Sequence, residues 1–102
     1  MLQRKVIMYE TSVVAFRRLQ VSFLNKGFYI VSLDPLYQII YVKKKGSFPS
    51  KILTFKIKIL GIGNKSTAII QTEGYMAILF SLWRHHIERL LSELEECIKN
   101  SI

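Results

Sequence analysis

Two adjacent histidines, His85 and His86, have side chains that bind metals and transfer protons. They fall in a stretch with helical periodicity, where neighbouring side chains point about 100° apart, so one helix cannot direct both rings at one metal ion. No third ligand stands at a recognisable spacing from them. The pair is interpreted as two partly exposed helix residues, and no metal or other cofactor is expected.

Cys97 is the single cysteine, so no disulfide can form within the chain. A thiol becomes a nucleophile when a histidine or a cation lowers its pKa. In the sequence no histidine or pair of cations stands beside Cys97, which lies on or next to the apolar stripe of the last predicted helix. We interpret it as an ordinary semi-buried thiol.

Neither the glycines nor the acidic residues form a catalytic motif. Gly61 and Gly63 are separated by one residue, but they join two predicted strands and lack the Gly-Lys-Ser/Thr ending of a phosphate loop. The glutamates near the C-terminus fall on the wet face of a helix and form no paired-carboxylate site. The sequence therefore predicts a protein that is not an enzyme.

Basic residues are the strongest chemical signal in this chain. The formal net charge is +8 and the pI is about 9.8. Residues 1–74 hold twelve Lys or Arg and three acidic residues, whereas residues 75–102 hold three Lys or Arg and four acidic residues. The positive excess belongs to the predicted strands and first helix, and it bears on partners rather than on fold.

Six lysines gather around one predicted hairpin, with Tyr37, Tyr41 and Phe48 among them. They are Lys43, Lys44, Lys45, Lys51, Lys56 and Lys58. Such a strip attracts phosphate backbones through counterion release, and aromatic faces stack on unpaired bases. The alternative is that these lysines keep the protein soluble and protect exposed strand edges. Weak nucleic-acid binding without sequence preference is therefore one hypothesis for function.

The whole chain, residues 1–102, is expected to form a single domain, because two domains of half this length would each lack a core. The longest apolar run, residues 75–83, is too short for a membrane span, which needs about 20 residues. The basic N-terminus precedes too short an apolar region for a secretory signal. A cytoplasmic location is expected.

Periodicity predicts the elements that must position these side chains. Apolar residues at three- and four-residue steps indicate a helix after a capping Thr11 or Ser12, ended by Gly27, and a second helix over 83–98. The apolar stripe of the second helix is Trp83, Ile87, Leu90, Leu91, Leu94 and Ile98.

Strands are predicted at 4–9, 28–33, 37–44, 51–60 and 66–73. Over 51–60 the residues alternate, with Leu53, Phe55, Ile57 and Ile59 on one face, so one face is buried and the other is wet. No helix separates the last four strands, which favours an antiparallel meander. The predicted class is α+β, an antiparallel sheet in β-α-β-β-β-β-α order with a long C-terminal helix packed on one face.

This order and several landmarks resemble small domains of the helix-grip, START-like class. The positions that carry the resemblance are Gly27-Phe28, Ile30, Ser32, Asp34, Lys45-Gly46-Ser47, Trp83, Ile87, Leu90, Leu91 and Leu94. The resemblance implies a curved sheet gripping the C-terminal helix. In larger members a cavity between sheet and helix holds an apolar ligand, so binding of an apolar small molecule there is the alternative function. A chain this short is expected to fill the cavity with its own side chains.

Residues 75–83 would be apolar nearly all round if they form a helix. In a small monomer such a helix buries only one side against the core, so the remaining apolar side needs another cover. Tyr75, Leu79 and Leu82 are predicted to contribute to a self-association surface, with Ala77 beside them, and a homodimer is the expected state. A membrane surface and an apolar ligand are the competing covers. The main hypothesis is thus a basic, non-enzymatic interaction domain that self-associates and binds nucleic acid weakly.

Overall fold

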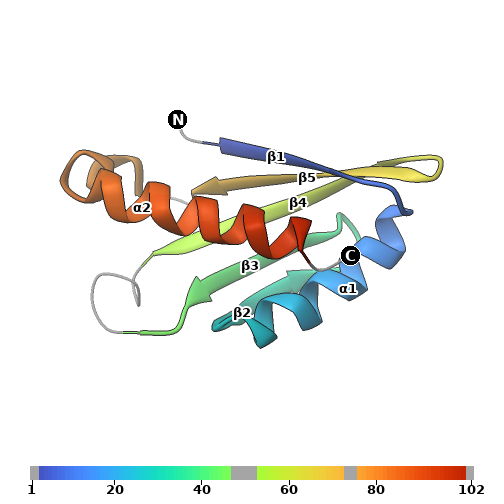
Figure 1. The fold of residues 1–102 in the computed structure, drawn as a ribbon, viewed down its shortest axis with the longest axis horizontal. Helices are drawn as coiled ribbons and strands as arrows, with labels where there is room; N and C mark the ends of the chain where they lie inside the picture. Colours follow the sequence, from blue (N-terminus) through green and yellow to red (C-terminus); the bar gives the residue numbers. More distant parts are fainter. Residues whose placement is uncertain (1–2, 47–52, 73–75, 101–102) are drawn as a thin grey trace.

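The computed structural model describes residues 3–46, 53–72 and 76–100, with only the backbone described for 76–82. The described elements follow the predicted order, which is confirmed, and Figure 1 shows their arrangement. They are β1 (Gln3–Met8), α1 (Ser12–Asn25), β2 (Phe28–Asp34), β3 (Ile39–Lys44), β4 (Thr54–Ile62), β5 (Lys65–Thr72) and α2 (Met76–Lys99).

The strands form one antiparallel sheet in the order β1-β5-β4-β3-β2. The meander from β2 to β5 is confirmed, and β1 joins it beside β5. Both helices pack on the same face of the sheet, and α2 runs diagonally across it (Figure 1). No described element covers the opposite face, which we call the outer face.

The core lies between the helices and the inner face of the sheet. The predicted stripe of α2 is confirmed, since Ile87, Leu90, Leu91, Leu94 and Ile98 are at most 1% exposed and Trp83 packs against the core. The predicted alternation is also confirmed, because Phe55, Ile57 and Ile59 of β4 are buried, as is Leu53 just before the strand. Full burial of one such side chain stabilises the fold by about 1.5–3 kcal/mol.

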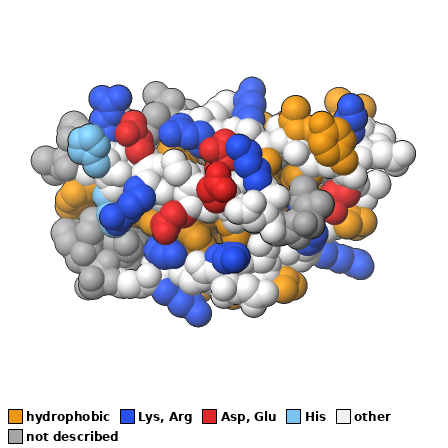
Figure 2. Space-filling view, viewed as in Figure 1, with side chains coloured by type: hydrophobic (Ala, Val, Ile, Leu, Met, Phe, Trp, Pro, Cys, Tyr) orange, Lys and Arg blue, Asp and Glu red, His pale blue; other side chains and the backbone are white. Residues whose placement is uncertain are grey.

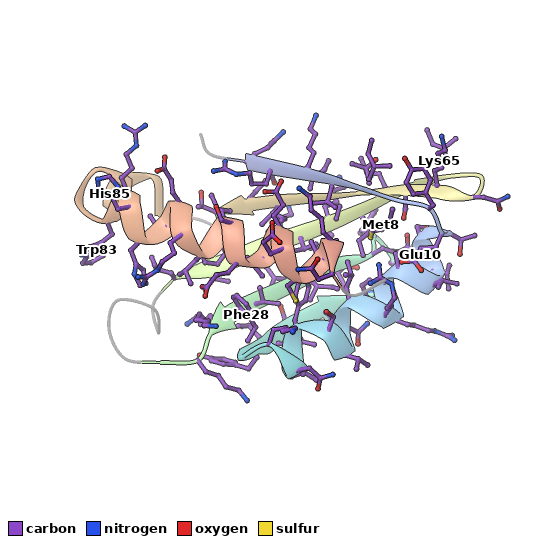
Figure 3. All side chains as sticks on the ribbon, in the orientation of Figure 1. Met8, Glu10, Phe28, Lys65, Trp83 and His85 are labelled. Atoms are coloured by element: carbon purple, nitrogen blue, oxygen red, sulfur yellow. The ribbon has the colours of Figure 1, made fainter. Side chains whose placement is uncertain are left out.

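Helix α1 begins and ends where its sequence predicts. Thr11 is the N-cap, and its side-chain oxygen accepts a hydrogen bond from the Val14 amide at 3.4 Å. Gly27, at φ 85°, turns the chain from the end of the helix into β2. This turn places Phe28, the first residue of β2, in the core on the face of the sheet that carries the helices (Figure 3).

Two strand predictions needed adjustment. Strand β3 begins at Ile39 and not at residue 37, because Gln38 has φ 55° and the Asp34 carboxylate accepts the Tyr37 amide, which keeps residues 35–38 in a turn. In β2 the strict alternation is broken at Val31, where pairing shifts between Ile30 and Ser32.

The β4–β5 connection is shorter than the gap between the predicted strands 51–60 and 66–73. Gly61 and Ile62 belong to β4, so only Gly63 and Asn64 form the turn, and Gly63 has φ 60°. Gly61 has a different role. A Cβ atom there would lie 2.7 Å from the Ser12 Cβ atom, so glycine allows β4 to approach the start of α1.

We expect Gly61→Ala to lower the free energy of unfolding by about 1–3 kcal/mol, because the added methyl group forces β4 away from Ser12. Denaturant unfolding monitored by circular dichroism measures the loss. Ser12→Gly removes the clashing atoms, so it should restore much of the stability in the Gly61→Ala background while destabilising the wild type slightly. Strictly additive losses would show that this contact is not the cause.

Helix α2 is kinked. Trp83 departs from helical geometry, with φ −121° and ψ 33°, so the segment before it does not continue the axis of the segment after it. Helix α2 therefore consists of two helical pieces. Residues 76–82 form the first piece, and the residues after Trp83, which carry the buried stripe, form the second. None of the described helices is both long enough and apolar enough to cross a membrane.

Candidate functional site

The space between the sheet and the two helices is filled by side chains of the core cluster, as expected for so short a chain. Phe23, Phe28, Phe55, Met8 and Leu19 are among the largest side chains buried there. A ligand has room at the rim of the core, where the last turns of α2 stand above β2 and β3.

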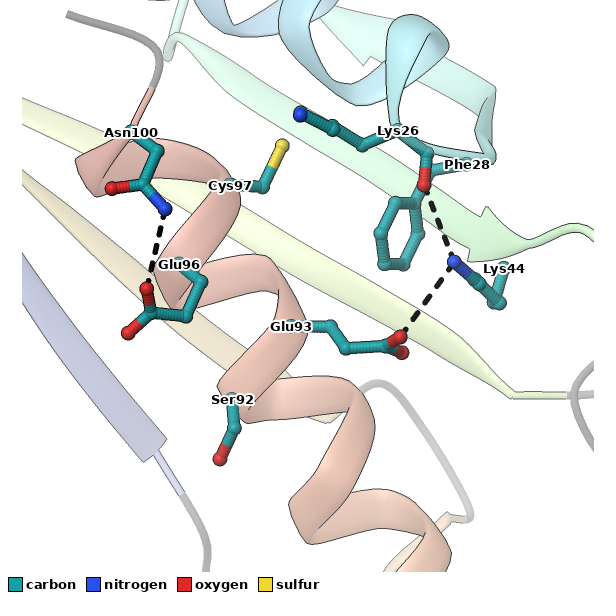
Figure 4. A pocket seen from close by; sticks show the side chains of 8 residues that line it. All are labelled: Lys26, Phe28, Lys44, Ser92, Glu93, Glu96, Cys97 and Asn100. Carbon is teal, nitrogen blue, oxygen red and sulfur yellow. Dashed lines mark hydrogen bonds and ion pairs between the residues drawn. The ribbon is translucent and has the colours of Figure 1, made fainter.

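At that rim lies a cleft of about 350 Å³, which we call the Phe28 cleft (Figure 4). It opens between the second half of α2, the end of α1 and the ends of β2 and β3. Its lining residues are Lys26, Phe28, Lys44, Ser92, Glu93, Glu96, Cys97 and Asn100. Ligand pockets in proteins range from about 300 to 1,000 Å³, so the cleft suits a small molecule.

Lys44 covers the aromatic floor of the cleft. Its Nζ atom lies 4.8 Å from the centroid of the Phe28 ring, in a cation–π contact. The same Nζ donates to the Lys26 carbonyl oxygen at 3.2 Å and lies 3.8 Å from a Glu93 carboxylate oxygen (Figure 4). Phe23 packs edge-on against Phe28 from below, with ring centroids 6.2 Å apart. The floor is a pair of packed aromatic rings, and the Lys44 side chain lies over it.

Cys97 forms the wall of the cleft next to α1. It is 4% exposed, its Sγ atom lies 3.3 Å from Ser22 Oγ, and Ser22 Oγ donates to the Cys97 carbonyl oxygen at 3.3 Å. These contacts tie α2 to α1. Cys97 is thus buried, and not semi-buried as the sequence predicted, and the hydroxyl group of Ser22 is not a base that could activate a thiol.

The structure divides the predicted lysine strip between the two faces of the sheet. Lys43, Lys56 and Lys58 alternate with the buried residues of β3 and β4 and therefore lie on the outer face. Lys44 lies on the inner side, in the Phe28 cleft. Lys45 is exposed beyond the end of β3, and Lys51 lies outside the described residues. Nucleic-acid binding by this set remains a prediction.

The predicted self-association residues are not described in enough detail to be placed. Tyr75 lies outside the described residues, and the side chains of Leu79 and Leu82 lie outside the described part of α2. The backbone of 76–82 is helical, which the prediction of a surplus apolar face had assumed.

The histidine pair points in two directions, as its adjacent positions on the helix predicted. His85 is exposed, and His86 Nδ1 lies 2.8 Å from the Arg89 guanidinium. A guanidinium can only donate, so Nδ1 accepts and His86 is neutral in this contact. Among the described residues, no group of three or more His, Cys, Asp or Glu side chains could hold a metal ion.

The pKa of His86 lies below the usual 6.5, because burial disfavours the charged ring and the Arg89 cation repels it, while Glu93 acts in the opposite direction. The unfolded chain binds this proton at a higher pH than the folded chain does. His86 therefore makes the folded state less stable as the pH falls from 6.5 toward its lowered pKa.

An NMR titration should give a midpoint for His86 below 6.5, and Arg89→Gln should raise that midpoint because it removes the repelling cation. Lys99→Gln removes a charge in the last turn of α2 and serves as the control, with no change expected. A midpoint unchanged by Arg89→Gln would show that Arg89 does not influence this ring.

The Phe28 cleft was not among the sites predicted from the sequence. Lys44 was grouped with its neighbours in sequence, although the alternation of Ile40, Val42 and Lys44 already placed it on the inner face. The contribution of Phe28 had no such signal, because the approach of α2 to the beginning of β2 is a tertiary contact between residues about seventy positions apart in the sequence.

Comparisons with known proteins identify the fold. No family model and no curated protein matches the sequence. Among solved structures, the di-domain ARO/CYC BexL from the BE-7585A biosynthetic pathway matches with a TM-score of 0.52 and 10% identity over 96% of this chain, which spans 46% of BexL. The Aha1 dimer from Colwellia psychrerythraea matches with a TM-score of 0.51 and 12% identity over 92% of this chain and 95% of that one.

Ara h 8.0201 matches with a TM-score of 0.46 and 11% identity over 95% of both chains. The first two matches, together with the order and pairing of the strands, show which fold this chain has. The chain has the helix-grip fold of START-like domains, and the resemblance inferred from the sequence is confirmed.

Proposed function

We propose that this protein is a non-enzymatic binding domain that holds a small, mainly apolar molecule in the Phe28 cleft. The observation that carries the proposal is a cleft of about 350 Å³ with an aromatic floor, located between the sheet and the C-terminal helix. Apolar surface with a few polar groups at the rim is typical of small-molecule sites.

The ligand must displace the ammonium group that covers Phe28. The Lys44 side chain is 26% exposed and the Glu93 side chain 43%, so the ion pair between them is partly solvated and weak. A flat apolar ring that takes the place of the ammonium gains contact with Phe28, while Lys44 moves toward water. Moving the Lys44 ammonium group off the Phe28 ring costs little free energy, because the long side chain can still place its charged end in water.

The polar groups at the rim limit what the ligand can be. Ser92, Glu93 and Glu96 are exposed on one wall, and Asn100 donates to Glu96 at 3.3 Å. Lys26 and Lys44 stand on the other wall. A ligand with one polar end can bond to either wall, and its apolar body faces Phe28. Long lipid chains exceed the space, because the core below the floor is filled.

A thermal-shift panel of small aromatic and aliphatic compounds tests this function, because a ligand that binds only the folded state raises the melting temperature by mass action. At a concentration of about 100 times Kd the stabilisation reaches about 2.7 kcal/mol, which is several degrees for a domain of this size. Fatty acids with long chains should produce smaller shifts than compact aromatic compounds.

Ser92→Tyr places a bulky ring at the mouth of the cleft and should abolish the shift without disturbing the core, since Ser92 is exposed. Lys99→Tyr, in the last turn of the same helix and outside the cleft, is the matched control and should keep the shift. The proposal fails if no compound stabilises the wild type, or if both variants respond alike.

Self-association is a separate proposal about the first piece of α2. The apolar residues of 75–83 exceed what one side of a small domain can cover, and the kink at Trp83 separates this segment from the stripe that packs on the sheet. We propose that a second copy covers Tyr75, Leu79 and Leu82. The contact then adds apolar burial that a monomer of this size does not supply.

Sedimentation at tens of micromolar protein should give a dimer of this 11.9 kDa chain. Leu79→Glu with Leu82→Glu should yield a monomer, because burying a charge without a partner is costly. Leu36→Glu changes a leucine that is 82% exposed in the β2–β3 turn and should leave the dimer intact. A monomeric wild type at this concentration would contradict the proposal.

A further inference from the structure

The outer face of the sheet brings together cations and tyrosines from three strands. Tyr29 in β2 pairs with Lys43 in β3, and Tyr41 in β3 pairs with Lys56 in β4. All four alternate with core residues and so share the outer face with Lys58, which is two positions beyond Lys56. We call these five residues the outer platform.

The register fixes the spacing within the outer platform. Residues directly opposite each other have Cβ atoms about 4.5–5.5 Å apart, and diagonal neighbours lie about 7–8 Å apart. Tyr29 and Tyr41 are diagonal neighbours, and so are Lys43 and Lys56. Two aromatic rings therefore alternate with two ammonium groups on a path that crosses β2, β3 and β4, and Lys58 continues the positive charge along β4.

Charge on the outer platform is not balanced by the described residues. Lys43, Lys56 and Lys58 form no ion pair with another described residue, and the register places one described carboxylate on this face, that of Asp34 at the edge, which accepts the Tyr37 amide. The helix-bearing face is different, since Figure 2 shows acidic and basic side chains interspersed over α2. The unbalanced positive charge therefore lies opposite the helices.

We propose that the outer platform binds single-stranded nucleic acid without sequence preference. Phosphate groups complement the lysines, and base–aromatic stacking supplies affinity that accepts any base. A duplex offers the phosphates but hides the base faces, so the tyrosines favour a single strand. The site is independent of the Phe28 cleft, which lies on the other side of the sheet. It differs from the strip predicted from the sequence, because Lys44 is excluded and Tyr29 is included.

Fluorescence anisotropy with labelled twelve-nucleotide oligo-dT and oligo-U, at 50 mM salt and up to tens of micromolar protein, measures the binding. Three lysines on a single strand predict a log–log salt slope of roughly −2, at about −0.7 per phosphate. A duplex of the same length should bind more weakly than either single strand.

Paired variants separate this site from the general charge of the protein. Lys56→Gln with Lys58→Gln should weaken binding about tenfold and reduce the magnitude of the salt slope by roughly 1, because two phosphate contacts are lost. Lys26→Gln with Lys99→Gln removes the same charge from the helix side and should change binding less than twofold. Melting curves verify that each variant is folded.

Tyrosine variants test stacking. Tyr41→Thr keeps a residue suited to a strand but loses the ring, and should weaken binding at least fivefold, whereas Tyr41→Phe keeps the ring and should bind like the wild type. The proposal is overturned if the wild type gives no anisotropy change, if the helix-side control loses as much affinity as the platform variant, or if Tyr41→Thr binds as well as Tyr41→Phe. Equal binding of a duplex, or of a polyglutamate peptide of matched charge, would also overturn it.

Discussion

Burial of one helical stripe against one face of the sheet is the interaction on which the rest of this structure depends. Five residues of α2, from Ile87 to Ile98, are at most 1% exposed. Each such side chain contributes about 1.5–3 kcal/mol, whereas the net stability of a native protein is only about 5–15 kcal/mol. Loss of these five buried side chains would cost a free energy comparable to the net stability of a whole domain. Any function of the protein must therefore leave this contact in place, which directs ligands to the rim of the core and partners to the outer face.

The filled core explains why the candidate site lies where it does. The helix-grip arrangement places a helix over a curved sheet, and here the chain fills the interior with Phe23, Phe55 and their neighbours. Space remains at the end of α2, where the helix passes over the beginning of β2. Lys44 lies there because β3 ends just beyond Val42, and a long side chain on the inner face can reach water only at the end of the strand. The position of the cleft therefore follows from two features: the core residues occupy the interior, and β3 ends at the rim beside the first residue of β2.

The fold could be predicted from the sequence because its helices and strands follow from the local periodicity of apolar residues. The stripe of α2, the alternation of β4, and the capping by Thr11 and Gly27 each depend on residues within a few positions of one another. The Phe28 cleft depends on contacts between β2, β3 and α2, for which local patterns have no signal. The lysines are a different case, because the local alternation of a strand already directs adjacent Lys43 and Lys44 to opposite faces, whereas the predicted strip joined them in one group. Tyr29 was not predicted to be part of a binding surface, because it stands opposite Lys43 only through the pairing of β2 with β3, which local patterns do not show.

The two sides of the molecule differ in charge because the glutamates of α2 lie on one side only. The exposed side of α2 carries glutamates that pair with cations around them, as Glu93 does with Lys44, Glu88 with Arg84 and Glu95 with Lys99. Such pairs offset the positive charge on the side where the helices lie. No described helix covers the outer face, so its half-buried lysines have no helix glutamates beside them, and Lys56 stands opposite Tyr41. A ligand cleft on one side and a cationic, aromatic surface on the other can therefore act independently, because the packed core and the sheet separate them.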